Sequence, residues 1–441
     1  MITTINSAAP VGESERITIL DSLRGFAILG ILLMNMPGFS LPDSVGSDPS
    51  TMNEFGTINY TIWYFITWFM NGTQRALFSM LFGAGIILFI GRQENKVDGL
   101  QPADYFFRRQ LWLIALSLFD VWILMWSGDI LLDYACYGMM LFVFRKLPPR
   151  TLIIAACVCL LFQVARENRD LYERKSMISA GEAVAAIDTT QIKLTDAQKE
   201  KLDDLTSFKK RVTHESKLER RKKDMTVVQG SYGEVYHYWT EMYTSHLISY
   251  LYFEIWDVIL FMLLGMALFK MGILTGKAKV STYMWFTIVG LGVGLSLSYL
   301  RVKFVLDYNF NWFEFVKGVP LSLYNLDRSF RSVGILGLIM LLYKSGLFGW
   351  LFAMLRPVGQ MALTNYLSQS LICAIIFYGI GFSLYGELQR YETYLVVLAI
   401  WIFQIIFCNI WMRFFLYGPC EWIWRSLTYW KPQAFVRSQR K

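Results

Sequence analysis

The sequence has little charge and almost no histidine. Only 17% of its 441 residues are charged, against about 25% in an ordinary soluble domain, while 55% are hydrophobic and the mean hydropathy is +0.38. Its three histidines and six cysteines lack the spacing of a zinc site, so we expect no metal. It also lacks a Ser-His-Asp arrangement, an HExxH motif, a Walker loop and a strand-linked GxGxxG. These absences exclude the common soluble-enzyme templates and indicate a chain that lies largely in lipid.

Basic residues outnumber acidic ones, and the net charge is +8. They are scattered at the ends of apolar runs and are not gathered on one face, as a nucleic-acid site would require. We therefore expect no nucleic-acid partner and interpret the basic residues as membrane topology signals.

Apolar runs that are long enough, or nearly so, to cross a bilayer recur along the whole chain. They predict an all-α polytopic membrane bundle of about ten transmembrane helices. An aromatic-rich run at 59–70 leaves open a lipid-surface helix or a half-span. The ten predicted spans are 19–38, 74–91, 110–127, 130–145, 151–165, 247–270, 281–300, 330–344, 358–382 and 393–416.

The loop charges predict an orientation. Arg92, Arg109 and the tail from Arg425 fall on the side that carries the N-terminus, whereas loop 39–58 holds three acidic residues and no basic residue. Because Lys and Arg accumulate in cytoplasmic loops, both termini are predicted to be cytoplasmic.

One segment differs sharply from the rest in composition. Residues 166–229 hold 15 Lys/Arg and 12 Asp/Glu of the chain's 76 charged residues, and a capped helix is expected from Thr195. We predict a charged, helical, extracytoplasmic insert. The predicted domains are an N-terminal bundle at 1–165, the insert at 166–235, a C-terminal bundle at 236–430 and a basic cytoplasmic tail at 431–441.

The first span carries three polar residues, which are expensive in hydrocarbon and so point to function or to partners. Asp21 and Arg24 are three residues apart and can pair on one helical face. Asn35 lies eleven residues after Arg24, about three turns along the same face. We expect these side chains to face other helices and a polar cavity.

Two further charged residues, each close to a turn between predicted spans, are candidates for a role in catalysis or binding. Arg75 lies at the start of a span, where a cation opposes the helix dipole, so an anionic partner or substrate is expected beside it; a snorkelling arginine is the alternative. Asp129 follows a tight turn and is placed to cap the next helix; orienting an acceptor hydroxyl is the second interpretation.

Polar side chains in the C-terminal half also leave alternatives open. Asn365 and Gln369 are one turn apart in a span, where they either form hydrogen bonds to neighbouring helices or line a polar cavity. In the second case the charged residues Asp327, Arg328 and Arg331 would line the same cavity. His246, with His237, is a candidate general base, although a structural role at the interface is the alternative. Arg425 is placed to meet an anionic cofactor from the cytoplasm.

Five segments, taken in order, resemble the YeiB-like family of bacterial membrane proteins of unknown function. The resemblance covers most of the chain outside the insert and places it in the bacterial inner membrane. The segments are Leu20–Ala27, Phe78–Gly85, Gly128–Leu131, Met361–Ser370 and Gly418–Arg425.

More distantly, the Arg24-Gly25 opening of the first span is similar to the transmembrane acyltransferase superfamily. That resemblance implies about ten helices around a cavity, an acyl-CoA donor from the cytoplasm and an acceptor on the far side. The O-acetylating branch has a histidine eleven residues after the arginine. Here Asn35 stands at that position, and asparagine can orient a substrate but cannot take its proton.

These observations lead to a hypothesis of acyl transfer from acyl-CoA, most simply acetyl-CoA, to an envelope glycan, a lipid or a small molecule. Asp21, Arg24, Arg109, Asn365 and Gln369 would bind the donor. Asn35, Asp129, Arg75 and His246 are the candidate catalytic residues. A transporter or lipid-handling protein without this chemistry is the alternative, membrane lipids are expected partners, and a homodimer is left open.

Overall fold

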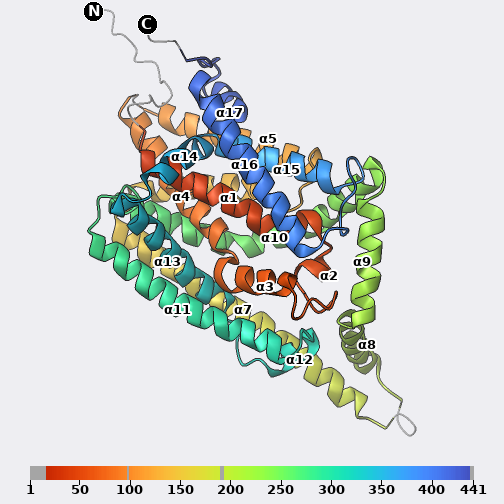
Figure 1. Ribbon diagram of the computed structural model, residues 1–441. Helices are drawn as coiled ribbons and strands as arrows, with labels where there is room; N and C mark the ends of the chain where they lie inside the picture. The colour runs from red at the N-terminus through yellow and green to blue at the C-terminus, as the bar shows by residue number, and fades with distance from the viewer. Residues whose placement is uncertain (1–15, 97–98, 189–192, 438–441) are drawn as a thin grey trace, which may run out of the picture.

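The computed structural model of the chain consists almost entirely of helices (Figure 1). It describes residues 16–96, 99–188 and 193–437, without the side chains at 246, 248–250 and 253. Across these residues there is no strand, only an isolated bridge between Phe415 and Val436. The predicted all-α class is confirmed.

The helices follow one another with short connections. In chain order they are α1 (Thr18–Ser40), α2 (Asp43–Gly46), α3 (Ile58–Phe65), the π-helical η2 (Ile66–Met70), α4 (Thr73–Glu94), α5 (Gln101–Trp122), α6 (Leu131–Leu141), the 3-10 helix η3 (Phe142–Lys146), α7 (Pro149–Ala185), α8 (Asp196–Arg211), α9 (His214–Val228), α10 (Tyr232–Lys270), α11 (Val280–Asp307), α12 (Trp312–Gly318), α13 (Tyr324–Ser345), α14 (Gly349–Gln360), α15 (Ala362–Phe377), α16 (Arg390–Phe414) and α17 (Pro419–Tyr429).

Helix α1 runs through the centre of the bundle (Figure 1) and packs on α4, α14, α15 and α16. Fifteen of its 23 residues are buried, which an all-round apolar sequence makes possible. Two glycines allow the closest approach, because a Cβ on Gly25 would overlap the carbonyl oxygen of Leu355 and one on Gly359 that of Asp21. The first turns of α1 are therefore held directly against α14.

Fewer helices satisfy the length and apolarity of a membrane span than the ten predicted. Among the described residues five do so, and a sixth is added if the pair α14 and α15, bent by 77°, is taken as one span. The five are Thr18–Ser40, Ile58–Glu94, Pro149–Ala185, Val280–Asp307 and Arg390–Phe414.

The shortfall has two physical causes. Helix α6 has only 11 residues, about 16 Å, which is roughly half of a 30 Å hydrocarbon core. Helices α5 and α13 are long enough but carry charged residues along their length, among them the buried Asp120 and Arg331. The run at 59–70, left open above, joins α4 as the first part of one interrupted helix, with the break at Asn71 and Gly72.

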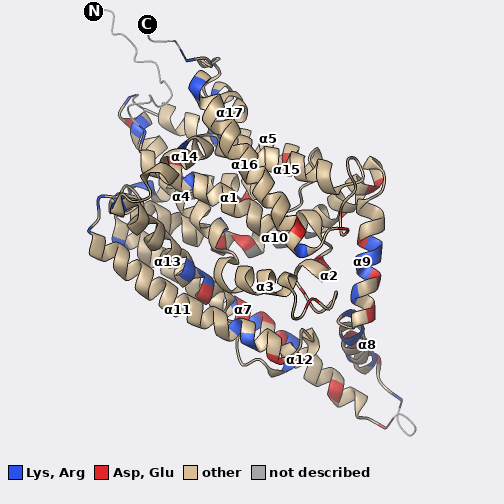
Figure 2. Cartoon of the chain, in the orientation of Figure 1, with Lys and Arg blue, Asp and Glu red and all other residues tan. Residues whose placement is uncertain are grey.

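The charged segment forms helices that continue the bundle. Figure 2 shows charged residues along α8, α9 and the distal part of α7. Thr195 caps α8 through a capping box with Gln198, as predicted. Leu171 and Ile178 of α7 and Leu205 of α8 pack with α12 in a small separate core. The domain boundaries proposed at 165/166 and 235/236 lie inside the continuous helices α7 and α10.

Candidate functional site

A cavity of about 230 Å³ lies between the first turns of α1, the second half of α4, α5, the α14–α15 junction and α17. It is at the end of the bundle where α14 and α17 lie (Figure 1). Arginine dominates its charged lining, which consists of Arg16, Arg24, Arg92, Arg109, Arg425, Asp21 and Glu421. Five cations against two acids make the wall attractive to anions.

Asp21 and Arg24 form the ion pair predicted from their spacing. The guanidinium Nη1 of Arg24 lies 3.0 Å from Oδ1 of Asp21, and the Gln360 amide donates to Oδ2 of Asp21 at 3.2 Å. Since Asp21 is satisfied on both oxygens, its position beside Arg24 is fixed. Arg24 keeps 29% of its side chain exposed, so the pair presents its cationic half to the cavity.

Arg109 is held by aromatic rings, not by an acid. Its guanidinium carbon lies 3.7 Å from the ring centroid of Trp424 and 5.1 Å from that of Phe89, and the indole of Trp424 donates to the Arg109 carbonyl at 2.8 Å. Arg425 likewise lies 4.6 Å from the ring of Tyr417. In the described part of the chain, neither arginine has a carboxylate oxygen within 4.0 Å. Stacking occupies the faces of these cations and leaves their edge N–H groups for a ligand.

Glu421 serves the backbone of the bent helix pair. It accepts hydrogen bonds from the backbone amides of Leu363 and Thr364, at 2.7 and 3.0 Å, and from the Thr364 hydroxyl. These groups are the free donors at the start of α15, where a carboxylate is favoured. Burial raises the pKa of Glu421, and its hydrogen bonds from Thr364 act against that rise. Glu421 therefore does not neutralise Arg425, although the two lie four residues apart.

The rest of the cavity wall is apolar and aromatic. Beyond the arginines it is formed mainly by Phe78, Phe82, Leu113, Ile130, Leu131, Tyr134 and Tyr366. A cationic end joined to an apolar end is complementary to a molecule that carries phosphate at one end and a less polar group at the other.

Three of the predicted donor-binding residues meet in this cavity, namely Asp21, Arg24 and Arg109. The predicted residue Asn35 does not line it. The eleven residues that separate Asn35 from Arg24 carry it about 16 Å along α1, whereas the cavity covers only the first two turns of that helix. The expectation that the ion pair and this amide share one pocket is therefore wrong.

Arg75 has the anionic partner that its position demanded. Its guanidinium pairs with Glu254 and Asp257 of α10. Asp257 also pairs with Arg328, and both side chains are almost fully buried. Arg75 thus belongs to an internal ion network and lies outside the arginine-lined cavity.

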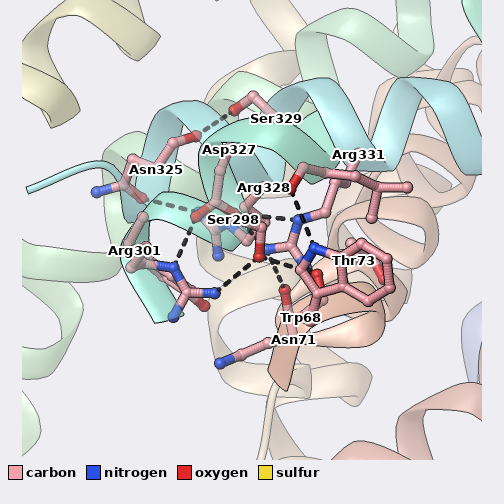
Figure 3. Close-up of polar contacts among 12 residues, drawn as sticks. Trp68, Asn71, Thr73, Ser298, Arg301, Asn325, Asp327, Arg328, Ser329 and Arg331 are labelled. Carbon is pink, nitrogen blue, oxygen red and sulfur yellow. Dashed lines mark hydrogen bonds and ion pairs between the residues drawn. The ribbon is translucent and has the colours of Figure 1, made fainter. Parts of the chain in front are cut away.

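A second ion cluster holds the break in the helix Ile58–Glu94. Figure 3 shows Arg301 and Arg331 converging on Asp327. Arg331 also donates to the carbonyl oxygens of Trp68 and Asn71, at 3.1 and 3.2 Å, which the break leaves without helical partners. Asp327, Arg328 and Arg331 therefore stabilise the bundle and do not charge the cavity, contrary to one of the two interpretations offered above.

Asp129 caps helix α6, as predicted. Its Oδ2 accepts from the backbone amides of Leu131 and Leu132, at 3.0 and 3.2 Å, and from the Ser117 hydroxyl. Its Oδ1 accepts from the phenol of Tyr366 at 3.2 Å. Asp129 does not itself line the cavity but touches Tyr366, which does.

Asn365 and Gln369 connect helices. Gln369 donates to Gln404 of α16 at 2.9 Å, and Asn365 donates to the Val358 carbonyl at 3.0 Å. Both are buried and neither lines the cavity, which favours the interhelical interpretation. The side chain of His246 lies outside the described residues. The described residues contain no cluster of His, Cys, Asp or Glu suited to a metal.

Sequence reasoning missed several residues of the site. Trp424 stacks on Arg109, Gln360 donates a hydrogen bond to Asp21, and Tyr366 connects the cavity with Asp129. A signal was present for Trp424, because the segment Glu421–Arg425 reads Glu-Trp-Ile-Trp-Arg and brings aromatic and cationic residues together, but its partner on α5 lies 315 residues away.

Comparison with known proteins places the chain in a family. Residues 268–431 match the family model described as "Protein of unknown function (DUF418)". The chain is 30% identical to the "Uncharacterized protein YxaH" of Bacillus subtilis (strain 168), over 98% of this chain and 99% of the relative. It is 28% identical to the "Uncharacterized protein YeiB" of Escherichia coli (strain K12), over 94% of this chain and 96% of the relative. No solved structure matches the chain. Full-length similarity at this level, together with the matching family model, shows that the chain belongs to the YeiB-like family of proteins of unknown function.

Proposed function

We propose that this protein is an integral membrane acyltransferase of the bacterial inner membrane that takes an acyl group from acyl-CoA bound in the arginine-lined cavity. The observation that carries the proposal is the pair Arg109 and Arg425, which face the cavity without a carboxylate partner in the described chain. A cation that the protein does not neutralise is suited to neutralisation by a ligand. Phosphate is the natural choice, because guanidinium groups bind it with two parallel hydrogen bonds.

The volume of the cavity limits how much of the proposed donor it would hold. A cavity of about 230 Å³ is smaller than the roughly 300–1,000 Å³ of sites for drug-sized ligands, so it would hold only part of acyl-CoA. We place its phosphates at Arg24, Arg109 and Arg425, and its acyl-thioester end beside Phe78 and Phe82. With both termini in the cytoplasm, as the loop charges predict, the arginine end faces the compartment that contains acyl-CoA.

The reaction would be attack of an acceptor hydroxyl or amine on the thioester carbonyl, with loss of the CoA thiolate. An envelope glycan, a lipid or a small molecule is the acceptor class. Neither Asn35 nor Arg75 lines the cavity, and Arg75 is paired with Glu254 and Asp257, so the proposed reaction gives neither residue a role at the carbonyl.

A direct assay tests the proposal. Purified protein is incubated with radiolabelled acetyl-CoA and bacterial envelope extract, while label transfer and free thiol are measured. We expect both to rise with protein concentration and to fall at least tenfold in Arg109→Met. The matched control is Asp104→Asn, because Asp104 is exposed and lies at the start of the same helix, outside the cavity. Absence of donor binding and of thiol release would reject the acyltransferase.

A transporter or lipid-handling protein remains the second candidate, because a sharp helix break borders the cavity. Gly359, Gln360 and Leu363 at the 77° bend between α14 and α15 all line it. Interrupted helices of this kind are typical of substrate sites in transporters. Uptake of a phosphate-bearing solute into proteoliposomes without covalent change would favour this alternative over acyl transfer.

A further inference from the structure

Two buried carboxyl groups lie together beside the cavity in unlike surroundings. Asp120 of α5 faces Asp129, and the two residues are 0% and 2% exposed. Asp129 accepts four hydrogen bonds, from Ser117, Tyr366 and two backbone amides. Both carboxyl oxygens of Asp120 lack a hydrogen-bond donor among the described residues.

No basic residue in the described part of the chain forms an ion pair with either carboxyl group. Among the described residues, the polar neighbour of Asp120 besides Asp129 is the Ser370 hydroxyl. The other titratable groups that face the two carboxyls are uncharged or acidic. They are the phenols of Tyr243, Tyr366 and Tyr378 and the carboxyl of Asp133.

The contrast in donors decides where the charge can reside. A carboxylate that accepts several hydrogen bonds is stabilised in its ionised form, whereas a buried carboxyl without donors, next to a carboxylate, is stabilised in its neutral form. We propose that Asp120 and Asp129 hold one proton between them at neutral pH, with Asp120 as the acid and Asp129 as the carboxylate. Neutral Asp120 then has a proton to donate toward Asp129.

Tyr366 connects this pair to the cavity. Tyr366 lines the cavity wall. Its hydroxyl group donates a hydrogen bond to Oδ1 of Asp129, and the hydroxyl oxygen of Tyr366 accepts one from the Ile130 amide at 3.2 Å. The pair is therefore one hydrogen-bonded phenol away from the ligand space. Asp129 does not itself reach the ligand space. It positions the Tyr366 hydroxyl group and would accept a proton from it.

Resting on the proposed function, the pair supplies the proton acceptor that no described histidine provides. As the acceptor oxygen or nitrogen bonds to the thioester carbon and the carbon–sulfur bond breaks, the acceptor's proton passes to Tyr366. The proton of Tyr366 moves at the same time to Oδ1 of Asp129. The departing CoA thiolate then takes a proton back along the same route, so protons and charge balance over the cycle.

Infrared spectroscopy of the full chain in lipid tests the proton-sharing independently of activity. The carbonyl stretch of a protonated carboxyl group is compared between the native protein, Asp120→Asn and the exposed control Asp104→Asn. We expect a band at pH 7 that Asp120→Asn loses and Asp104→Asn keeps. A native spectrum unchanged by Asp120→Asn would overturn the pair.

Asp129→Asn gives a second measurement if Asp120→Asn does not fold. It should keep the band and shift its frequency, because Asp120 retains its proton but loses its charged neighbour. Loss of the band in Asp129→Asn, with retention in Asp120→Asn, would contradict the assignment.

The relay itself is tested by Tyr366→Phe in the labelled acetyl-CoA assay. We expect kcat to fall about a hundredfold, a typical loss for general acid–base catalysis, with KM unchanged. An unchanged kcat would overturn the relay. If the spectra behave as expected but the native protein transfers no label, the proton-sharing pair stands and the acyltransferase proposal fails.

Discussion

Two arginine-rich regions of this molecule look alike in sequence and differ in structure. Arg328 and Arg331 are buried, and each is paired with an aspartate inside the bundle. Arg109 and Arg425 line a cavity and rest on aromatic rings, with no carboxylate partner in the described residues. The comparison teaches that a charged residue in an apolar helix indicates structure or function according to whether the protein itself neutralises it.

The paired region should be the more fragile. Asp327→Asn leaves Arg331, which is fully buried, without a full counter-charge, and should lower the free energy of unfolding by about 3–5 kcal/mol. Thermal unfolding in detergent, followed by circular dichroism, measures this. Asp104→Asn is the control, since an exposed pair contributes at most about 1 kcal/mol. Equal, small losses in both variants would remove the distinction between the regions.

The buried amides provide an intermediate case. Gln369→Leu removes the hydrogen bond to Gln404 and should cost about 0.6 kcal/mol, the average for such bonds between membrane helices. Affinity for CoA should not change, because Gln369 does not line the cavity. A several-fold loss of CoA affinity would restore the donor-binding role predicted from the sequence.

Glu421 should make ligand binding depend on pH. Its pKa is raised by burial, so its negative charge at the cavity wall appears only above that raised pKa. CoA should therefore bind a few-fold more tightly as pH falls through this window, from the raised pKa toward the ordinary value of 4.5.

Glu421→Gln is the matched control for this effect. The variant has no titratable side chain at residue 421, while the phosphates of CoA titrate equally with both proteins. The pH dependence of the native protein should exceed that of Glu421→Gln, and identical pH profiles in a fluorescence titration would contradict the prediction.

The unpaired region should tolerate loss of charge. Arg109→Met keeps an apolar stem against Trp424 and leaves no carboxylate without a partner. Its free energy of unfolding should fall by about 0.5–2 kcal/mol, the contribution of a lost cation–π contact, and so by less than that of Asp327→Asn. A loss as large as that of Asp327→Asn would show that Arg109 is structural.

Much of the fold was predictable where local chemistry decides it. The helical class, the buried first helix and the cap at Thr195 all follow from apolar runs and capping residues. The number of membrane crossings was not predictable, because the length of an apolar run overestimates the length of a helix that ends within it. The predicted span 130–145 turns into a 3-10 helix at Phe142, so α6 covers only 11 residues.

The candidate site was predictable only within single helices. Asp21 and Arg24 pair because they are neighbours on one helical face, a property of spacing alone. Arg75 required a partner, but Glu254 and Asp257 lie 179 and 182 residues further along the chain. Stacking of Arg109 on Trp424 likewise depends on how α17 packs against α5, which no local pattern encodes.

Equilibrium binding of labelled CoA to the purified protein and to Arg109→Met tests the central claim most directly. An unpaired guanidinium in the cavity should contribute a charge-assisted hydrogen bond to phosphate of at least about 1.4 kcal/mol, so Kd should rise tenfold or more while thermal stability falls less than in Asp327→Asn. Equal affinity in the two proteins, or no binding to either, would contradict the assignment of this cavity as a phosphate-ligand site.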